Sequence, residues 1–159
     1  MTATAAAARG QQHAQTVRTY FEACNEANRE KFYSVLADDV VHYFPPQVGG
    51  PYRGKEAVAN LWIWFVKEKG SQWTIDRLVS DGREVVMEWT HFKTRAGEHI
   101  RGAEWYEFDA DGKISEIRAY YASPRDSAAR INELEGFPYG DKGFALTAPT
   151  VPPEIAANA

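Results

Sequence analysis

The sequence predicts an α+β domain in which three N-terminal helices pack on a strongly curved antiparallel sheet, giving a cone-shaped α+β barrel. Three observations support this fold class. Apolar residues recur at helical spacing before Gly70, four β-rich runs follow it, and short Gly-containing breaks separate those runs. The 159 residues are enough for one domain with a sizeable core. A curved sheet covered by helices leaves one open mouth, which suits a small-molecule pocket.

Three helices are expected before Gly70. The first carries an apolar stripe with i, i+3, i+4, i+7 spacing, formed by Val17, Tyr20, Phe21 and Cys24. A second, short helix covers residues 29–36 and ends at Asp38-Asp39. The third covers residues 55–69. Because it is apolar on more than one side, we expect it to be covered on more than one side.

The strands follow a simpler order. A short β-rich run at residues 40–44 is stopped by Pro45-Pro46 and followed by a Gly/Pro-rich loop that ends at Gly54. Four further runs cover residues 72–80, 83–94, 98–108 and 113–122. The breaks between these four are short hairpin signals, so sequential neighbours should pair antiparallel as a meander.

The termini are expected to lie outside a single domain that covers residues 16–134. Residues 1–15 are rich in Ala, Thr and Gln and are predicted to be a flexible tail. Residues 125–134 are predicted to form one or two further helical turns. Residues 135–159 are rich in Gly and Pro and are predicted to be an irregular tail that caps the pocket or contacts a dimer partner.

Charge and composition exclude several classes of protein. There are 18 Lys+Arg against 22 Asp+Glu, a net charge of −4, so there is no basic excess for nucleic acid. No apolar run approaches the roughly 20 residues of a membrane helix. The start has no signal-peptide pattern and Cys24 is the single cysteine, so a cytoplasmic location is expected. Aromatic residues reach 13%, which favours an aromatic-rich core that can also line a pocket.

Strand parity places titratable side chains on apolar faces. His91 continues the face of Val85, Met87 and Trp89, and Glu104 shares a face with Ile100, Gly102, Tyr106 and Phe108. His42 lies between Val40 and Phe44, and the last strand presents Ser115, Ile117, Ala119 and Tyr121 together. An ionised carboxylate is costly to bury, so Glu104 is either a functional group or the partner of Arg101 or Arg118.

The candidate site follows from these faces. The catalytic candidates are Glu104, Tyr20, His91 and His42. The substrate-binding candidates are Phe44, Trp62, Met87, Trp89, Tyr106, Ile117 and Tyr121. Each has a structural alternative, because an inward histidine is often a hydrogen-bonded core residue and Tyr20 and the tryptophans can simply fill the core.

The order of these features resembles one known family. Two helices, Asp38-Asp39 before a strand, a loop ending in Gly54, a third helix and a meander that closes on residues 112–121 (GKISEIRAYY) are similar to the SnoaL-like branch of the nuclear-transport-factor-2-like superfamily. The resemblance covers about residues 16–122. The superfamily includes ketosteroid isomerase, polyketide cyclases, limonene epoxide hydrolase and scytalone dehydratase as well as proteins without catalytic activity, so the fold alone does not define the reaction.

None of these chemistries is matched completely. The ketosteroid isomerase pattern implies Tyr20 and a neutral Glu104 as hydrogen-bond donors, but Phe44 stands where that pattern has its base. The paired aspartates of limonene epoxide hydrolase and the late-strand aspartate of polyketide cyclases are missing from the inward positions. For the scytalone dehydratase pattern, His42 and His91 could supply the histidines, but the first helix offers no aspartate.

The leading hypothesis is acid/base chemistry on a carbonyl compound, by an isomerase, a dehydratase (lyase) or a cyclase-like enzyme that needs no organic cofactor. Neutral Glu104 and Tyr20 would donate two hydrogen bonds to one carbonyl oxygen, and His91 or His42 would take the proton. The alternatives are non-catalytic binding of an apolar small molecule, an epoxide hydrolase-like hydrolase, and a metal site formed by His42, His91 and Glu104.

A homodimer is the expected assembly. The resemblance implies pairing through the outer face of the sheet. The residues expected on that face suit an interface, where aromatic residues and Arg are enriched: Glu88, Thr90, Phe92, Arg101 and Trp105. The expected partners are therefore a second copy of the chain and a small apolar or carbonyl-containing molecule.

Overall fold

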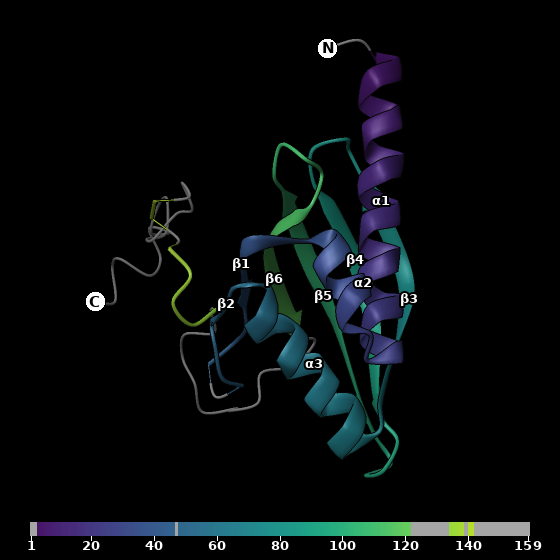
Figure 1. Ribbon diagram of the computed structural model, residues 1–159, viewed down its shortest axis with the longest axis vertical. Helices are drawn as coiled ribbons and strands as arrows, with labels where there is room; N and C mark the ends of the chain where they lie inside the picture. The colour runs from purple at the N-terminus through teal and green to yellow at the C-terminus, as the bar shows by residue number, and fades with distance from the viewer. Residues whose placement is uncertain (1–2, 47, 122–133, 139, 142–159) are drawn as a thin grey trace, which may run out of the picture.

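Three helices cover one face of a six-stranded sheet in the computed structural model of the protein (Figure 1). The structure describes residues 3–46, 48–121, 134–138 and 140–141. The helices are α1 (Ala3–Glu26), α2 (Arg29–Val35) and α3 (Lys55–Lys69). The strands are β1 (Leu36–Tyr43), β2 (Tyr52–Arg53), β3 (Ser71–Ser80), β4 (Val85–Lys93), β5 (Glu98–Phe108) and β6 (Ile114–Tyr121). The predicted α+β class is confirmed.

The sheet differs from the predicted antiparallel sheet, because it is mixed. Its order is β2-β1-β6-β5-β4-β3, and β1 pairs with β6 in parallel while every other neighbouring pair is antiparallel. The expected meander of β3 to β6 is present. No hairpin connects β1 to β6, so nothing in the local sequence forces those two strands to run in opposite directions. The barrel is also open, since β2 and β3 are the edges.

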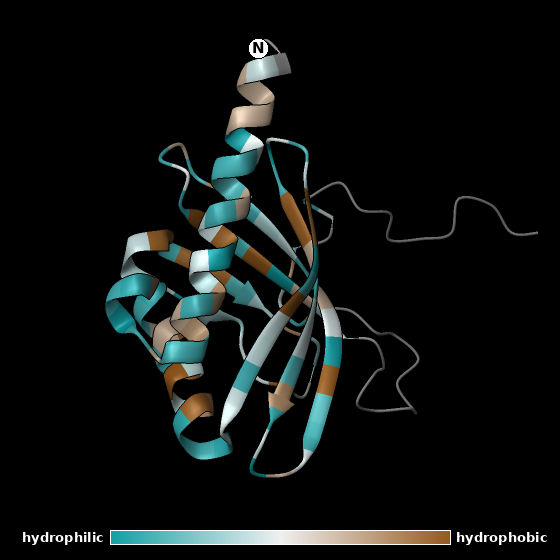
Figure 2. Cartoon of the chain, turned by 90° about the vertical axis from the view of Figure 1, so that its right-hand side faces the viewer, coloured by the Kyte–Doolittle hydropathy of each residue, from teal (hydrophilic) through white to brown (hydrophobic). Residues whose placement is uncertain are grey.

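Two irregularities bend the long strands. The β3–β4 register shifts between Ile75 and Arg77, and the β5–β6 register shifts between Glu107 and Phe108. A bulge of this kind bends a strand and increases its twist. Hydrophilic and hydrophobic residues alternate along the strands in Figure 2, as expected for a sheet with one covered face.

Helix α1 begins much earlier than the sequence suggests. Residues 3–15, assigned above to a flexible tail, form its first half, so that assignment is corrected. Alanine is the best helix former, and the buried stripe continues toward the N-terminus through Gly10 and His13. The His13 ring stacks on Phe108 at a centroid distance of 3.9 Å. Gly10 packs on the turn at Gly82, where an added side chain would meet the α1 backbone.

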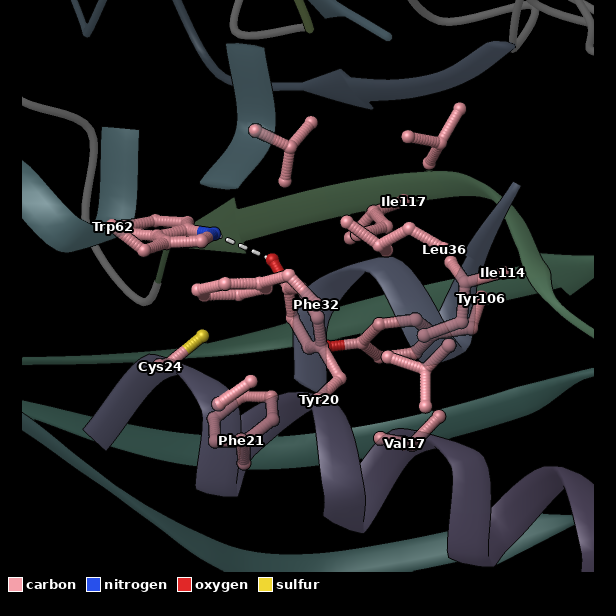
Figure 3. Packing of buried hydrophobic residues seen from close by; sticks show 14 of the residues in the cluster. Val17, Tyr20, Phe21, Cys24, Phe32, Leu36, Trp62, Tyr106, Ile114 and Ile117 are labelled. Carbon is pink, nitrogen blue, oxygen red and sulfur yellow. Dashed lines mark hydrogen bonds between the residues drawn. The ribbon is translucent and has the colours of Figure 1, made fainter. Parts of the chain in front are cut away.

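The core lies between α1, α2, α3 and the inner face of the sheet. Figure 3 shows part of it: Val17, Tyr20, Phe21 and Cys24 from α1 face Phe32, Leu36, Trp62, Tyr106, Ile114 and Ile117. All four residues of the predicted inward face of β4, Val85, Met87, Trp89 and His91, are at most 7% exposed. Strand parity therefore assigned this face correctly.

The outer face of the sheet exposes several aromatic side chains. Phe92 and Trp105 are each 39% exposed. Thr90 is different: it is buried, and its hydroxyl donates to Asp76 and accepts from Arg101. A homodimer through this face stays a prediction.

A short C-terminal segment packs beside β1. The Glu135 N–H donates to the Phe44 carbonyl at 2.9 Å, and Leu134 and Phe137 bury themselves against Tyr43. The helical turns predicted over 125–134 lie, except for Leu134, outside the described residues. None of the helices in the described part of the chain is long and apolar enough to cross a membrane.

Candidate functional site

A pocket lies between α3 and the inner face of the sheet. Its empty volume is about 480 Å³, including the part that opens to solvent. Six buried side chains form its floor: Phe44, Trp62, Trp73, Trp89, His91 and Glu104. Seven half-buried side chains form its rim: Val48, Tyr52, Leu61, Phe65, Lys93, Ile100 and Tyr121. The aromatic rings leave a narrow space with apolar walls.

Glu104 is the only carboxylate among the described residues that line this pocket. It lies inward on β5, opposite Met87 of β4, and is 5% exposed. The Tyr106 hydroxyl donates a short hydrogen bond to Oε2 of Glu104. Burial first, and the nearby Glu104 carboxylate second, raise the pKa of Tyr106 well above its ordinary value. Tyr106 therefore keeps its proton near neutral pH and holds the carboxyl group in place.

His42 is the histidine that lies beside Glu104. Its Nε2 is 3.5 Å from Oε1 of Glu104, and its ring stacks on Phe44 at 4.1 Å. The residue is fully buried, and neither ring nitrogen has a hydrogen-bond partner among the described residues. A small shift of either side chain would complete a hydrogen bond. The two side chains therefore lie next to each other on the inner face of the sheet.

His91 lies at the other end of the pocket. Its Nε2 is 2.7 Å from Ser71 Oγ, and its ring stacks on Trp73 at 4.4 Å. Its partner in register on β5 is Ile100, four residues before Glu104, which corresponds to about 13 Å along the strand. His91 and Glu104 therefore cannot act on the same pair of atoms.

The alternative metal site is not supported by this geometry. His42 and Glu104 are neighbours, but His91 is too far along the sheet to complete the set. Within residues 3–46, 48–121, 134–138 and 140–141, no three His, Cys, Asp or Glu side chains gather in a way that could hold a metal ion.

Tyr20 is buried behind the pocket floor. Its hydroxyl accepts a hydrogen bond of 2.5 Å from Trp62 Nε1 (Figure 3). Burial, with smaller effects of Cys24 and Glu104, raises its pKa well above the ordinary value. Tyr106, and not Tyr20, is the tyrosine that donates to Glu104. The expected pair of donors aimed together at a ligand is therefore not formed by Tyr20 and Glu104.

The alternative in which Glu104 pairs with Arg101 or Arg118 is not what the structure shows. Arg118 pairs with Glu107 at 2.6 Å and with Glu116. Arg101 lies 3.8 Å from Asp76 on the outer face. Neither guanidinium reaches Glu104, so the carboxyl group is not part of a structural ion pair with either arginine.

The residues predicted to bind substrate fall into two groups in the structure. Phe44, Trp62, Trp89 and Tyr121 line the pocket, while Met87, Tyr106 and Ile117 lie in the core at no more than 1% exposure. Seven further residues line the pocket that the sequence patterns do not indicate: Val48, Tyr52, Leu61, Phe65, Trp73, Lys93 and Ile100. Lys93 carried a usable signal, because it lies two residues after His91 on the same strand and so on the same face.

The buried thiol and phenols are expected to lower the stability of the protein at alkaline pH. Burial raises the pKa of Cys24, Tyr20 and Tyr106 well above their ordinary values of 9.0 for the thiol and 10.0 for the phenols. Above about pH 9 the unfolded chain loses protons that the folded chain keeps, so the free energy of unfolding must fall as pH rises. Each group contributes up to about 1.4 kcal/mol per pH unit.

Urea unfolding at pH 7, 8.5 and 10 measures this effect. We expect a constant stability up to about pH 8.5 and a loss above it. Cys24→Ala and Tyr106→Phe should each flatten the alkaline decline. Tyr33→Phe, at a half-buried tyrosine on α2, is the control. An unchanged slope in both core variants would show that these groups do not titrate on unfolding.

The fold and the site together define a class of protein: three helices on an open curved sheet, with one buried carboxyl group at the end of an aromatic pocket. The SnoaL-like domain family matches residues 17–117. The chain therefore belongs to the SnoaL-like domain family, in agreement with the resemblance described above.

Solved structures agree with this assignment. A protein of unknown function from Methylobium petroleophilum is 43% identical, with a TM-score of 0.85 over 90% of this chain and 97% of that chain. A proposed ketosteroid isomerase of Kribbella flavida is 22% identical, with a TM-score of 0.61 over 76% of this chain and 84% of that one.

A third structure is that of a Mycobacterium tuberculosis protein in complex with estradiol-17β-hemisuccinate. It is 21% identical, with a TM-score of 0.59 over 69% of this chain and 92% of that one. At such identities, the second and third structures establish the fold alone. No protein with a curated description matches the chain.

Proposed function

We propose that the protein is an enzyme for acid/base chemistry on a small carbonyl compound, with Glu104 as the proton-transferring group. One observation carries this proposal. Glu104 is a carboxyl group without an arginine partner, buried on the floor of an aromatic pocket and contacted by Tyr106 and His42. Titratable groups in such surroundings concentrate at active sites. Isomerisation, dehydration and aldol-type cyclisation all begin with removal of a proton next to a carbonyl group.

The side chains suggest a division of roles. Glu104 takes the proton from carbon, Tyr106 fixes its orientation, and His42 stabilises or receives the proton at Oε1. The apolar walls exclude water, which strengthens the electrostatic interactions inside the pocket.

Trp89 supplies a donor for the developing negative charge on oxygen. Its Nε1 is buried and has no hydrogen-bond partner among the described residues. In the β4–β5 register Trp89 faces Gly102, two residues before Glu104, so the indole and the carboxyl group are diagonal neighbours on one face. A hydrogen bond from this N–H to an enolate oxygen would replace the one predicted from Tyr20.

Trp89→Phe is expected to separate this role from packing. The smaller ring leaves a space that lowers the free energy of unfolding by about 1 kcal/mol. The substitution also removes an unpaired buried N–H, which raises the free energy of unfolding by a similar amount. We expect the thermal midpoint to change little and turnover to fall at least about tenfold. Trp73→Phe, on the same pocket floor, is the control for aromatic packing. Equal activity of the two variants would exclude Trp89 as the donor.

Hydrogen–deuterium exchange tests the proposed reaction without knowledge of the product. Enolisable ketones such as 2-tetralone and 4-phenyl-2-butanone are incubated with the protein in D₂O, and loss of the α-proton signal is followed by NMR. We expect exchange above the uncatalysed rate for at least one apolar ketone, and loss of that exchange in Glu104→Gln. Exchange that is equal in both proteins would reject Glu104 as the base.

Non-catalytic binding of an apolar molecule is the second candidate. The aromatic walls favour it, as does the complex of the Mycobacterium tuberculosis relative with a steroid ester. A binding protein should hold the same ketones with similar affinity after Glu104→Gln and should show no exchange in either form. Tryptophan fluorescence quenching measures that affinity, because three tryptophans lie on the pocket floor.

A further inference from the structure

Lys93 is a cation at the rim of the pocket with unused donors. It lies at the end of β4, and its side chain is 15% exposed. Its Nζ is 3.2 Å from Oε2 of Glu98, which is its only ion-pair or hydrogen-bond partner within the described part of the chain. An ammonium group has three N–H donors, so two remain for another acceptor. The Glu98 side chain is 62% exposed, and an ion pair with such a partner is weak and screened by salt.

The pocket therefore has opposite charges at its two ends. Lys93 is the only lysine or arginine among the described lining residues, and Glu104 is the only carboxylate. Lys93 pairs in register with Glu98 of β5. Glu98 precedes Glu104 by six residues, which corresponds to about 20 Å along the strand. The walls between them are apolar or aromatic and include Trp89, Ile100 and Phe65. The space is a slot with a cation near the rim and an acid on the floor.

We propose that this slot takes an elongated apolar acid, whose carboxylate binds Lys93 and whose reacting carbon lies at Glu104. A carboxylate offers two acceptors to the unused Lys93 donors, and a charge-assisted hydrogen bond is stronger than a neutral one. The same carboxylate would be repelled at the Glu104 end, so the charge distribution fixes the direction in which the molecule enters. The reacting end rests on the proposed function, whereas the anion-binding end stands on Lys93 alone.

Two matched probes test the anion-binding end. They are 4-(2-naphthyl)butanoate and the corresponding amide, which differ in charge and not in the apolar body. Binding of each is followed by quenching of the pocket tryptophans. We expect the wild-type protein to bind the acid at least about tenfold more tightly than the amide, because a hydrogen bond to a charged group is stronger than one to a neutral group. The preference should shrink at 0.5 M salt.

Three variants test whether the preference for the acid over the amide depends on Lys93. Lys93→Met keeps the apolar stem and should bind acid and amide equally. Glu98→Gln removes the competing carboxylate and should tighten the acid probe alone. Lys67→Met, at an exposed lysine on α3, should behave as the wild type. Thermal melts confirm that each variant is folded. If Lys93→Met keeps the acid preference, or if the wild type shows none, the inference is wrong.

The proposed function and the anion site can be rejected independently of each other. Glu104→Gln should keep the acid preference and lose ketone exchange. If it keeps exchange, the proposed function is rejected while the anion site stands. If Lys93→Met keeps the acid preference and Glu104→Gln loses exchange, the anion site is rejected while the proposed function stands.

Discussion

Glu104→Gln is expected to lower the rate of ketone exchange by about 10² to 10⁴-fold, the range that a positioned acid or base contributes. The amide has nearly the shape of the carboxyl group and can still accept the Tyr106 hydrogen bond. It cannot take up a proton at neutral pH. The substitution therefore removes the chemistry while it preserves the packing around Met87 and His42.

The measurement is the exchange rate by NMR, together with the thermal midpoint and probe affinity of each variant. Glu88→Gln is the matched control, since Glu88 is an exposed glutamate on the neighbouring strand. Tyr106→Phe should lower the rate of ketone exchange less than Glu104→Gln does. It keeps the carboxyl group and removes only the hydrogen bond that orients it. A Glu104→Gln protein that is folded, binds ketones and exchanges them at the wild-type rate would contradict the mechanism.

Gly102→Ala is expected to have the largest effect on stability, a loss of about 2–3 kcal/mol in the free energy of unfolding. A methyl group at this position would stand 2.6 Å from Cζ2 and 2.9 Å from Cη2 of Trp89, and closer still to the carbonyl oxygen of Tyr120. The backbone oxygen cannot rotate away, so the strands or the indole must move. The displaced Trp89 ring would also change the pocket.

Thermal and urea unfolding measure the loss, which corresponds to a fall of about 5–10 °C in a chain of this size. Gly97→Ala is the control. It has nothing within 4 Å of the added carbon, and it carries only the strain of a left-handed backbone at φ +65°, about 1 kcal/mol. If Gly102→Ala costs no more than Gly97→Ala, the close packing of Trp89 on this strand is not what the structure indicates.

The sequence predicts best the bounds of those elements that have glycines just outside their ends. Helix α3 begins after Gly54 and ends before Gly70, as its apolar stripe and flanking glycines indicate. Strand β5 lies between two Gly-containing turns and has the predicted bounds. In both, the periodicity and the breaks agree, so the local sequence is sufficient.

The site could be predicted only in outline. Parity shows that His42 and Glu104 both point inward, but not where along the sheet each lies. The parallel pairing of β1 with β6 makes His42 the neighbour of Glu104, whereas the antiparallel pairing of β3 with β4 places His91 beside Ser71. Tyr106 is a different case, because it lies two residues from Glu104 on one strand face and donates to that carboxyl group, a contact that parity alone allows.

The parallel pairing also bears on the order in which the molecule is assembled. The meander from β3 to β6 consists of contacts between strands that follow one another in the chain. The pairing of β1 with β6 instead brings Leu36 beside Ile114, which is far from it in the sequence. Contacts of long sequence separation close large loops and form slowly. We therefore expect β1 to dock late in folding. His42 would then reach Glu104 only after the meander that carries the acid of the site has formed.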